Sequence, residues 1–184
     1  WGPNLGLKPE FARSYEFGAE LGFLDNRLGI DATYYRKQTR DQIVENIRGS
    51  YATGFVLFNL NGAETRNEGV EVTLRGTPIE RPDFSWDVIG NFARARGKLL
   101  SLPAELPESY NADTWLYGNV RNGTKPGLST MSLTGFFYLR VDSAQGGHKG
   151  DLLIDPTTGL PLRSSNFIDG GYDRQPDFLI GVTN

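Results

Sequence analysis

The sequence predicts an all-β fold, namely a segment of an antiparallel transmembrane β-barrel with long extracellular loops. Two pairs of segments alternate apolar and polar residues, a short turn joins the members of each pair, and a long polar stretch follows each pair. Each segment is about eleven residues long, whereas strands of globular proteins usually have about five or six residues and a tilted membrane-crossing strand needs about nine to eleven. Length and alternation together therefore favour a barrel.

The first predicted strand is residues 14–24. Its odd positions from Tyr15 to Phe23 are apolar, and its even positions are small, polar or charged. Side chains on a strand point to opposite faces with period two, so this strand has one apolar and one polar face. The second strand, 28–37, shows the same pattern after the short connection 25–27, which is rich in residues that tolerate tight turns.

The third and fourth predicted strands form a second pair. Residues 38–64 lose the periodicity and hold several glycines and asparagines, so we expect a long loop there. Strand three is 65–75, a turn follows at 77–82, and strand four is 84–95. Ile89 is the one position that breaks the alternation of strand four.

Residues 96–176 carry most of the prolines and many glycines and make no clean membrane strands. Structureless connections longer than about fifteen residues are uncommon in compact domains, so this stretch is expected to be an elaborated functional loop region. Residues 177–184 begin another alternating strand. We therefore expect residues 1–184 to be a fragment of one barrel domain with hairpins at 14–37 and 65–95.

Loop lengths predict the sidedness of the barrel. Outer-membrane barrels have short periplasmic turns and long extracellular loops, which places 25–27 and 77–82 in the periplasm and 38–64 and 96–176 outside the cell. The residues expected to face lipid are Phe17, Leu21, Phe23, Ile30, Val70, Val72, Trp86 and Val88. The residues expected to face the lumen are Glu16, Glu20, Asp31, Thr33, Glu71, Thr73, Asp87 and Asn91.

A soluble β-sandwich is the alternative fold, because its strands also alternate between core and solvent. A sandwich of the immunoglobulin type would have shorter strands, with a turn about every eight to twelve residues. The polar strand faces also invite a paired-carboxylate hydrolase interpretation through Glu16, Glu20, Asp31 and Asp87. A barrel lumen needs polar residues at these positions in any case, so we expect no enzyme activity.

Composition excludes several other classes. The net charge of −3 gives no basic stripe for nucleic acid, and no run approaches the ~18 apolar residues of a membrane helix. The chain has no cysteine, and its one histidine, His148, has no second ligand at metal-binding spacing, so no metal or cofactor is expected. No signal peptide is visible, and we expect an internal stretch of a longer polypeptide.

The region 96–176 contains one cluster with the composition of a binding site. Flat aromatic rings stack on the apolar faces of sugars or peptides, while amides and carboxylates fix their orientation by hydrogen bonds. The candidate substrate-binding residues are Trp115, Tyr117, Tyr110, Asn119 and Arg121. The alternative is that these aromatic residues only pack a large loop against its neighbours.

Several segments resemble the C-terminal barrel region of the SusC/RagA family of TonB-dependent outer-membrane transporters. Residues 3–10 resemble the family's N-P-N-L-K-P-E element with an insertion, and 14–18 followed by 24–31 is the closest match. Residues 67–72 and 175–178 match two further recurrent stretches. The resemblance covers barrel and loops only, because the family's plug domain and energy-coupling box have no counterpart here.

The resemblance implies a barrel of about 22 strands in the outer membrane of a Gram-negative bacterium of the Bacteroidota. It implies active uptake of oligosaccharides or peptides, energy from the TonB complex acting on the missing N-terminal part, and a SusD-like surface lipoprotein over the loops. Two other functions stay open: a soluble extracellular carbohydrate-binding β-module that uses Trp115 and Tyr117, and a passive porin.

Overall fold

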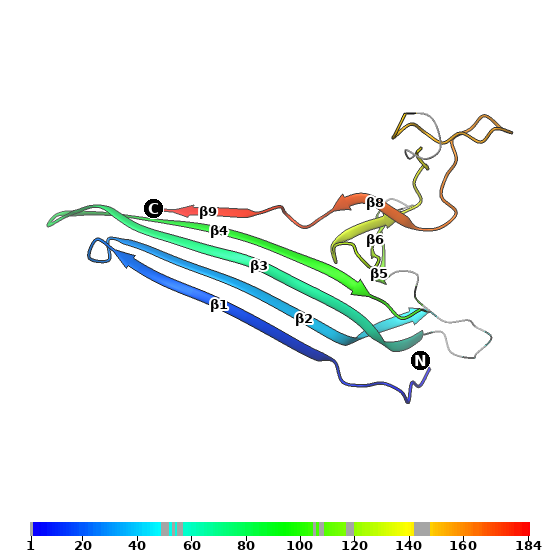
Figure 1. The fold of residues 1–184 in the computed structure, drawn as a ribbon, viewed down its shortest axis with the longest axis horizontal. Coiled ribbons are helices and arrows are strands. Elements are labelled where there is room, and N and C mark those ends of the chain that lie inside the picture. The colour runs from blue at the N-terminus through cyan, green and yellow to red at the C-terminus, as the bar shows by residue number, and fades with distance from the viewer. Residues whose placement is uncertain are drawn as a thin grey trace.

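The computed structural model describes residues 2–48, 52, 54, 57–104, 106, 109–116, 120–141 and 148–184. Its main sheet is antiparallel, with strand order β1-β2-β3-β4-β9 (Figure 1). These strands are β1 Phe11–Phe23, β2 Leu28–Arg48, β3 Leu57–Arg81, β4 Phe84–Ser101 and β9 Leu179–Thr183. The predicted all-β antiparallel class is confirmed, and the main sheet is a twisted segment of barrel wall.

Each alternating segment predicted from the sequence lies within one of these strands. β1 and β2 pair without a shift from Phe23↔Leu28 to Phe11↔Arg40. The turn between them places Leu24, Asp25 and Asn26 at φ of 56°, 54° and 67°, in the left-handed region that Asp and Asn tolerate better than most residues. This turn chemistry is the reason that two long strands reverse within so few residues.

The predicted loop at 38–64 is wrong for most of its length. β2 continues to Arg48 and β3 begins at Leu57, so paired strands occupy most of this range. Register shifts between Thr39 and Gln42 and between Val44 and Ile47 interrupt the alternation. β-Bulges keep backbone pairing while breaking period two, so hydropathy alone reports a loop where a strand continues.

The second turn also lies further along the chain than predicted. β3 extends through the predicted turn 77–82 to Arg81, and only 82–83 separate it from β4. A register shift between Gly76 and Ile79 accommodates Pro78, which cannot donate a ladder hydrogen bond. The Arg27 guanidinium donates to the Thr77 and Pro78 carbonyls, both at 3.2 Å, and so links the first turn to β3.

The region 96–176 is not a structureless loop. β4 continues through Ser101, and a second sheet follows with order β5-β6-β7-β8. Its strands are β5 Ser109–Leu116, β6 Val120–Thr124, β7 Ser132–Gly135 and β8 Ile168–Asp173. We call it the loop sheet; it lies at the long-loop end of the main sheet (Figure 1).

The described residues enclose almost no dry interior. The buried apolar side chains among them are Ala63 and Leu99, both at the long-loop end. All of β1 is exposed, and Phe17 keeps 68% of its surface accessible. A β-sandwich would bury one face of such strands, so the soluble sandwich fold is not the one observed. Within the described ranges, no helix has the length and apolar character required to cross a membrane.

Candidate functional site

The main sheet has two chemically distinct faces, which its register defines. Directly paired residues on neighbouring antiparallel strands have their side chains on the same face. The pairs Leu21↔Ile30 and Ile30↔Leu74 therefore share one face, and Glu20↔Asp31 and Asp31↔Thr73 share the other. Followed across the strands, the register puts every residue predicted to face lipid on the first face. It puts every residue predicted to face the lumen on the second.

The apolar face forms a band of limited height. On β1 it runs from Phe23 to Tyr15, which is about 26 Å along the strand at about 3.3 Å per residue. Strands of outer-membrane barrels tilt by about 35–45°, so this length corresponds to a height of about 19–22 Å, somewhat less than the apolar band of about 25 Å in such barrels. Beyond Tyr15 the same face becomes charged at Arg13.

The polar face is linked across strands by hydrogen bonds. Thr73 Oγ1 lies 3.0 Å from Asn91 Oδ1, and Thr77 Oγ1 donates to Asp87 Oδ1 at 2.7 Å. Arg75 lies 3.8 Å from Glu20 Oε1, an exposed pair between β3 and β1. These side chains orient one another across the sheet in the way expected of a water-accessible surface.

The carboxylates of the polar face contact a guanidinium and hydroxyl groups. Glu20 is opposite Asp31 in the register and pairs with Arg75, while Asp87 accepts hydrogen bonds from Thr77 and Ser85. Within the described ranges, no group of three histidine, aspartate or glutamate residues could hold a metal ion.

The predicted aromatic cluster is only partly described. Tyr117 and Asn119 lie outside the described residues, and Tyr110 and Trp115 are located by backbone pairing alone, opposite Gly123 and Arg121. Both are therefore on β5, beside β6. That places them in the loop sheet, at the end of the molecule predicted to be extracellular.

Arg121 has a packing role in the loop sheet. Its guanidinium lies 3.8 Å from the centroid of the Phe167 ring, and Phe167 lies 4.3 Å from Phe136. The Arg163 guanidinium lies over the Phe136 ring, 5.3 Å from its centroid. Burial lowers the pKa of Arg121 because it disfavours the charged form. This cation and ring stack holds β6 against the segment that leads into β8.

A contact that the sequence did not predict attaches the loop sheet to the main sheet. Ser129 pairs with Lys98 as an isolated bridge, and the Leu99 amide donates to the Leu128 carbonyl at 3.0 Å. The C-terminal part of β4, at Lys98 and Leu99, is thus paired with the loop region. Its middle part, from Ile89 to Ala93, pairs with β9. Nothing in the local pattern at 128–130 marks a strand, because the paired segment is so short.

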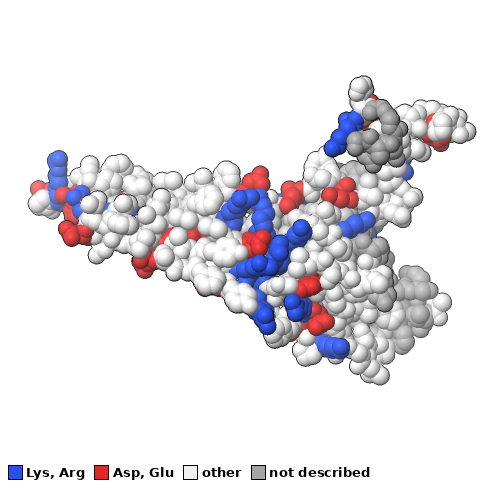
Figure 2. All heavy atoms as spheres, viewed as in Figure 1, with Lys and Arg blue, Asp and Glu red and all other residues white. Residues whose placement is uncertain are grey.

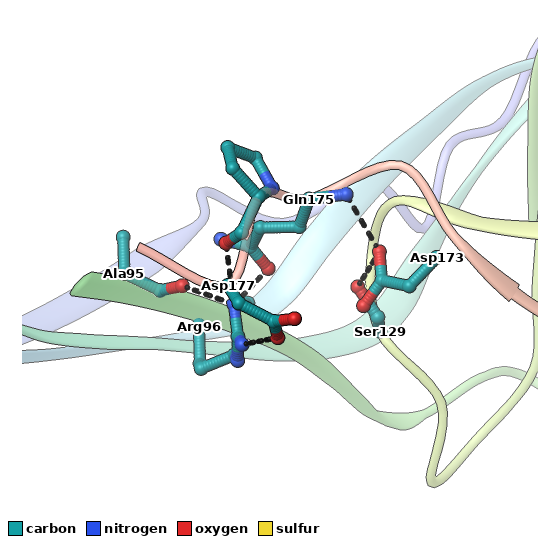
Figure 3. Close-up of polar contacts among 8 residues, drawn as sticks. Ala95, Arg96, Ser129, Asp173, Gln175 and Asp177 are labelled. Carbon is teal, nitrogen blue, oxygen red and sulfur yellow. Dashed lines mark hydrogen bonds and ion pairs between the residues drawn. The ribbon is translucent and has the colours of Figure 1, made fainter. Parts of the chain in front are cut away.

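A second missed contact joins the returning chain to β4 (Figure 3). Arg96 forms an ion pair with Asp177 and donates to the Pro176 carbonyl at 2.7 Å. Asp173 Oδ1 accepts from the Gln175 amide at 2.9 Å and from the Ser129 hydroxyl at 3.1 Å. We call these five residues with Arg96 the return clasp, since they fix the chain just before β9.

Comparison with known proteins identifies the family. Residues 1–167 match the family described as "TonB dependent receptor-like, beta-barrel". TonB-dependent receptor P3 of Formosa agariphila is 30% identical over 100 residues, which cover 54% of this chain and 10% of that protein. TonB-dependent receptor SusC of Bacteroides thetaiotaomicron is 29% identical over 189 residues, which cover 98% of this chain and 18% of SusC.

Solved structures show the same fold. The RagAB peptide transporter superposes with a TM-score of 0.66 at 21% identity, covering 94% of this chain and 19% of the solved chain. The RagAB peptide importer in its closed-closed state gives a TM-score of 0.62 at 20% identity, covering 95% and 20%. This chain thus spans a fifth or less of the length of these relatives. With its two-faced sheet and its match over residues 1–167, the chain belongs to the TonB-dependent receptor-like β-barrel family.

Proposed function

We propose that this chain forms part of the barrel wall and extracellular loops of an outer-membrane importer that takes up nutrients with energy from TonB. The observation that carries the proposal is the main sheet, whose long strands separate apolar from polar side chains without burying either face. Its family consists of outer-membrane transporters and receptors of Gram-negative bacteria rather than of enzymes. The apolar face then contacts lipid, and the polar face lines a water-accessible interior.

The remaining strands of the wall come from the rest of the polypeptide. In the described sheet, β1 and β9 are the edge strands. In lipid each unsatisfied backbone polar group costs several kcal/mol, so only a closed barrel is stable there. The greater length of the relatives supports a wall completed by further strands of the same chain.

The proposed substrates are oligosaccharides or peptides, captured by the extracellular loops together with a SusD-like lipoprotein. The RagAB relative is a peptide transporter, and RagAB and SusC share this fold or sequence region. The candidate capture residues on β5 are Tyr110 and Trp115. A plug, which lies outside these residues, would couple transport to TonB and would separate this importer from a passive porin.

The proposal predicts that charge is tolerated on one face of β1 and not on the other. In the full-length protein, Leu21→Lys should destabilise the barrel by about 1–3 kcal/mol, because Leu21 lies between the middle of the apolar band at Ala19 and its end at Phe23, where a lysine still faces hydrocarbon. Glu20→Lys, one residue away on the polar face, is the matched control and should assemble normally. The measurement is the fraction of folded, heat-modifiable protein in the outer membrane.

Two outcomes would contradict the proposal. Equal assembly of Leu21→Lys and Glu20→Lys would mean that the apolar face does not contact lipid. Recovery of the full-length protein in the aqueous fraction without detergent would favour the soluble carbohydrate-binding module instead.

Substrate capture is tested separately at the loop sheet. Trp115→Ala should weaken binding of an oligosaccharide or peptide substrate, with loss of about 1–3 kcal/mol if the ring is a central contact, while barrel assembly stays intact. Binding to full-length protein is measured by calorimetry. Unchanged affinity would assign Trp115 to packing.

A further inference from the structure

The apolar face of the main sheet ends in a row of cations at the long-loop side. Beyond the pair Phe17↔Tyr34, the next pairs on this face are Tyr15↔Arg36, Arg13↔Gln38 and Phe11↔Arg40. Arginine thus replaces apolar residues within about 7 Å of the last apolar pair, at about 3.3 Å per residue. Cations on a lipid-facing surface at this depth lie at headgroup level.

The basic side chains continue across β3 and β4. Arg66 is opposite Gln38 and Lys98, and Arg94 is opposite Val70, all on the same face. Figure 2 shows Lys and Arg, with a few Asp and Glu among them, gathered in a belt between the narrow part of the sheet and the loop region. We name as the basic rim Arg13, Arg36, Arg40, Arg66, Arg94 and Lys98.

Carboxylates neutralise only part of the basic rim. Arg40 Nε lies 3.2 Å from Glu64, and Arg66 Nε lies 3.5 Å from Glu68. Glu68 is opposite Arg36 in the register but pairs with Arg66, and among the described residues neither Arg13 nor Arg36 forms an ion pair. Arg13 and Arg36 therefore present positive charge on the apolar face of the main sheet, opposite the polar face.

A concave site lies at the β1 and β2 end of the basic rim. It has a volume of about 270 Å³ and is lined by Phe11, Arg13, Tyr15, Arg36, Gln38 and Arg40. Phe11 and Tyr15 are both more than half exposed. The site thus combines guanidinium forks, which match phosphate oxygens bidentately, with aromatic rings that pack against sugars or acyl chains.

From this juxtaposition we propose that the site binds the phosphorylated headgroup of an outer-leaflet glycolipid. The inference rests on the proposed function, which directs the apolar face to lipid and the long loops outward. Clusters of Lys and Arg next to a membrane-embedded surface recognise anionic headgroups, and aromatic rings prefer the same interface. A glycolipid bound at this site would anchor the barrel wall in the outer leaflet, next to the extracellular loops.

The test is titration of delipidated full-length protein in neutral detergent with lipid A, followed by native mass spectrometry. Arg36→Gln should weaken binding about fivefold, since a basic residue near an anionic surface contributes about 1 kcal/mol. Arg13→Gln, Arg36→Gln and Arg40→Gln combined should weaken it on the order of a hundredfold. Arg36→Lys keeps the charge but loses the bidentate guanidinium. Its affinity for lipid A should therefore lie between those of wild type and Arg36→Gln.

The matched control is Lys37→Gln, which removes a neighbouring cation on the opposite face of β2 and should leave binding unchanged. Lipid A stripped of phosphate should bind as weakly as the triple variant. Equal loss in Arg36→Gln and Lys37→Gln, or equal binding of the stripped lipid, would overturn the proposal. Displacement of lipid A by an equal concentration of inorganic phosphate would reduce the site to a general anion site and would also overturn it.

The variants are first shown to fractionate with the outer membrane and to retain heat-modifiable mobility. Unchanged lipid A binding in a triple variant that passes this check contradicts only the headgroup site. Failure of the wild-type protein to enter the membrane contradicts the proposed function itself.

Discussion

At the scale of single residues, the wall depends on one close approach between strands. An added Cβ at Gly69 would lie 2.6 Å from the Tyr35 hydroxyl oxygen and 2.8 Å from the Arg94 carbonyl oxygen. Tyr35 is directly opposite Gly69, so its ring crosses the polar face over the glycine. A tyrosine can move, but the backbone carbonyl of a paired strand cannot move without disturbing the ladder.

Gly69→Ala should therefore destabilise the full-length barrel by about 1–3 kcal/mol, the usual cost of overpacking. Gly90→Ala is the control, because a Cβ there meets nothing within 4 Å, and its effect should stay within about 0.5 kcal/mol. Urea unfolding in detergent micelles measures both. Equal free energies of unfolding for the two variants would show that the wall relaxes around Gly69 at no cost.

At the scale of elements, β2 and β3 show how far strands extend beyond the apolar band. β3 has 25 residues, about 80 Å at about 3.3 Å per residue, whereas a membrane crossing needs about nine to eleven residues. The Asn61 side chain of β3 stabilises the extension. It donates hydrogen bonds to the Lys8 carbonyl, in the segment before β1, and to the Asp41 carbonyl of β2, at 2.8 and 2.7 Å. The extension therefore belongs to the paired main sheet, and β4 beside it makes the contacts with the loop region.

The return clasp makes a separate prediction about the segment before β9. Arg96→Ala removes both the ion pair to Asp177 and the hydrogen bond to the Pro176 carbonyl, so 173–178 should become several times more sensitive to limited proteolysis. The exposed ion pair alone is worth only about 0–1 kcal/mol, so overall unfolding should change little.

Arg75→Ala removes another exposed ion pair, that with Glu20, and serves as the control for loss of an arginine. It should leave cleavage at 173–178 unchanged. The same protection in Arg96→Ala as in wild type would mean that backbone pairing of β9 with β4 holds the segment without the clasp.

At the scale of the whole molecule, these residues form an open sheet. β1 and β9 each have one unpaired edge in the described sheet, and exposed edges pair with other chains. The 184-residue chain expressed alone should therefore aggregate and give no heat-modifiable band in detergent, whereas the full-length protein should give one. Electrophoresis with and without heating distinguishes them, and a stable folded monomer of the isolated chain would contradict a wall completed by other strands.

Much of the wall could be predicted from the sequence. Alternation from Tyr15 to Phe23 and around Ile30 identified the strands, and both faces emerged with the predicted residues because side-chain period and register are coupled. The signal disappeared at 38–64, since register shifts interrupt the period there while the backbone pairing continues. The strands could therefore be predicted where the alternation is unbroken.

The amino-acid sequence by itself determined the all-β class, the antiparallel hairpins and which residues share a face, because these follow from local alternation and turn chemistry. Only the tertiary structure decided the length of β2 and β3, the pairing of 128–130 with β4, and the return clasp between Arg96 and Asp177. It also brought Arg13 of β1 into one rim with Arg94 of β4. These contacts join residues that are distant in the chain. Hydrogen bonds between backbone groups require no particular side chain, so they produce no periodic pattern in the sequence.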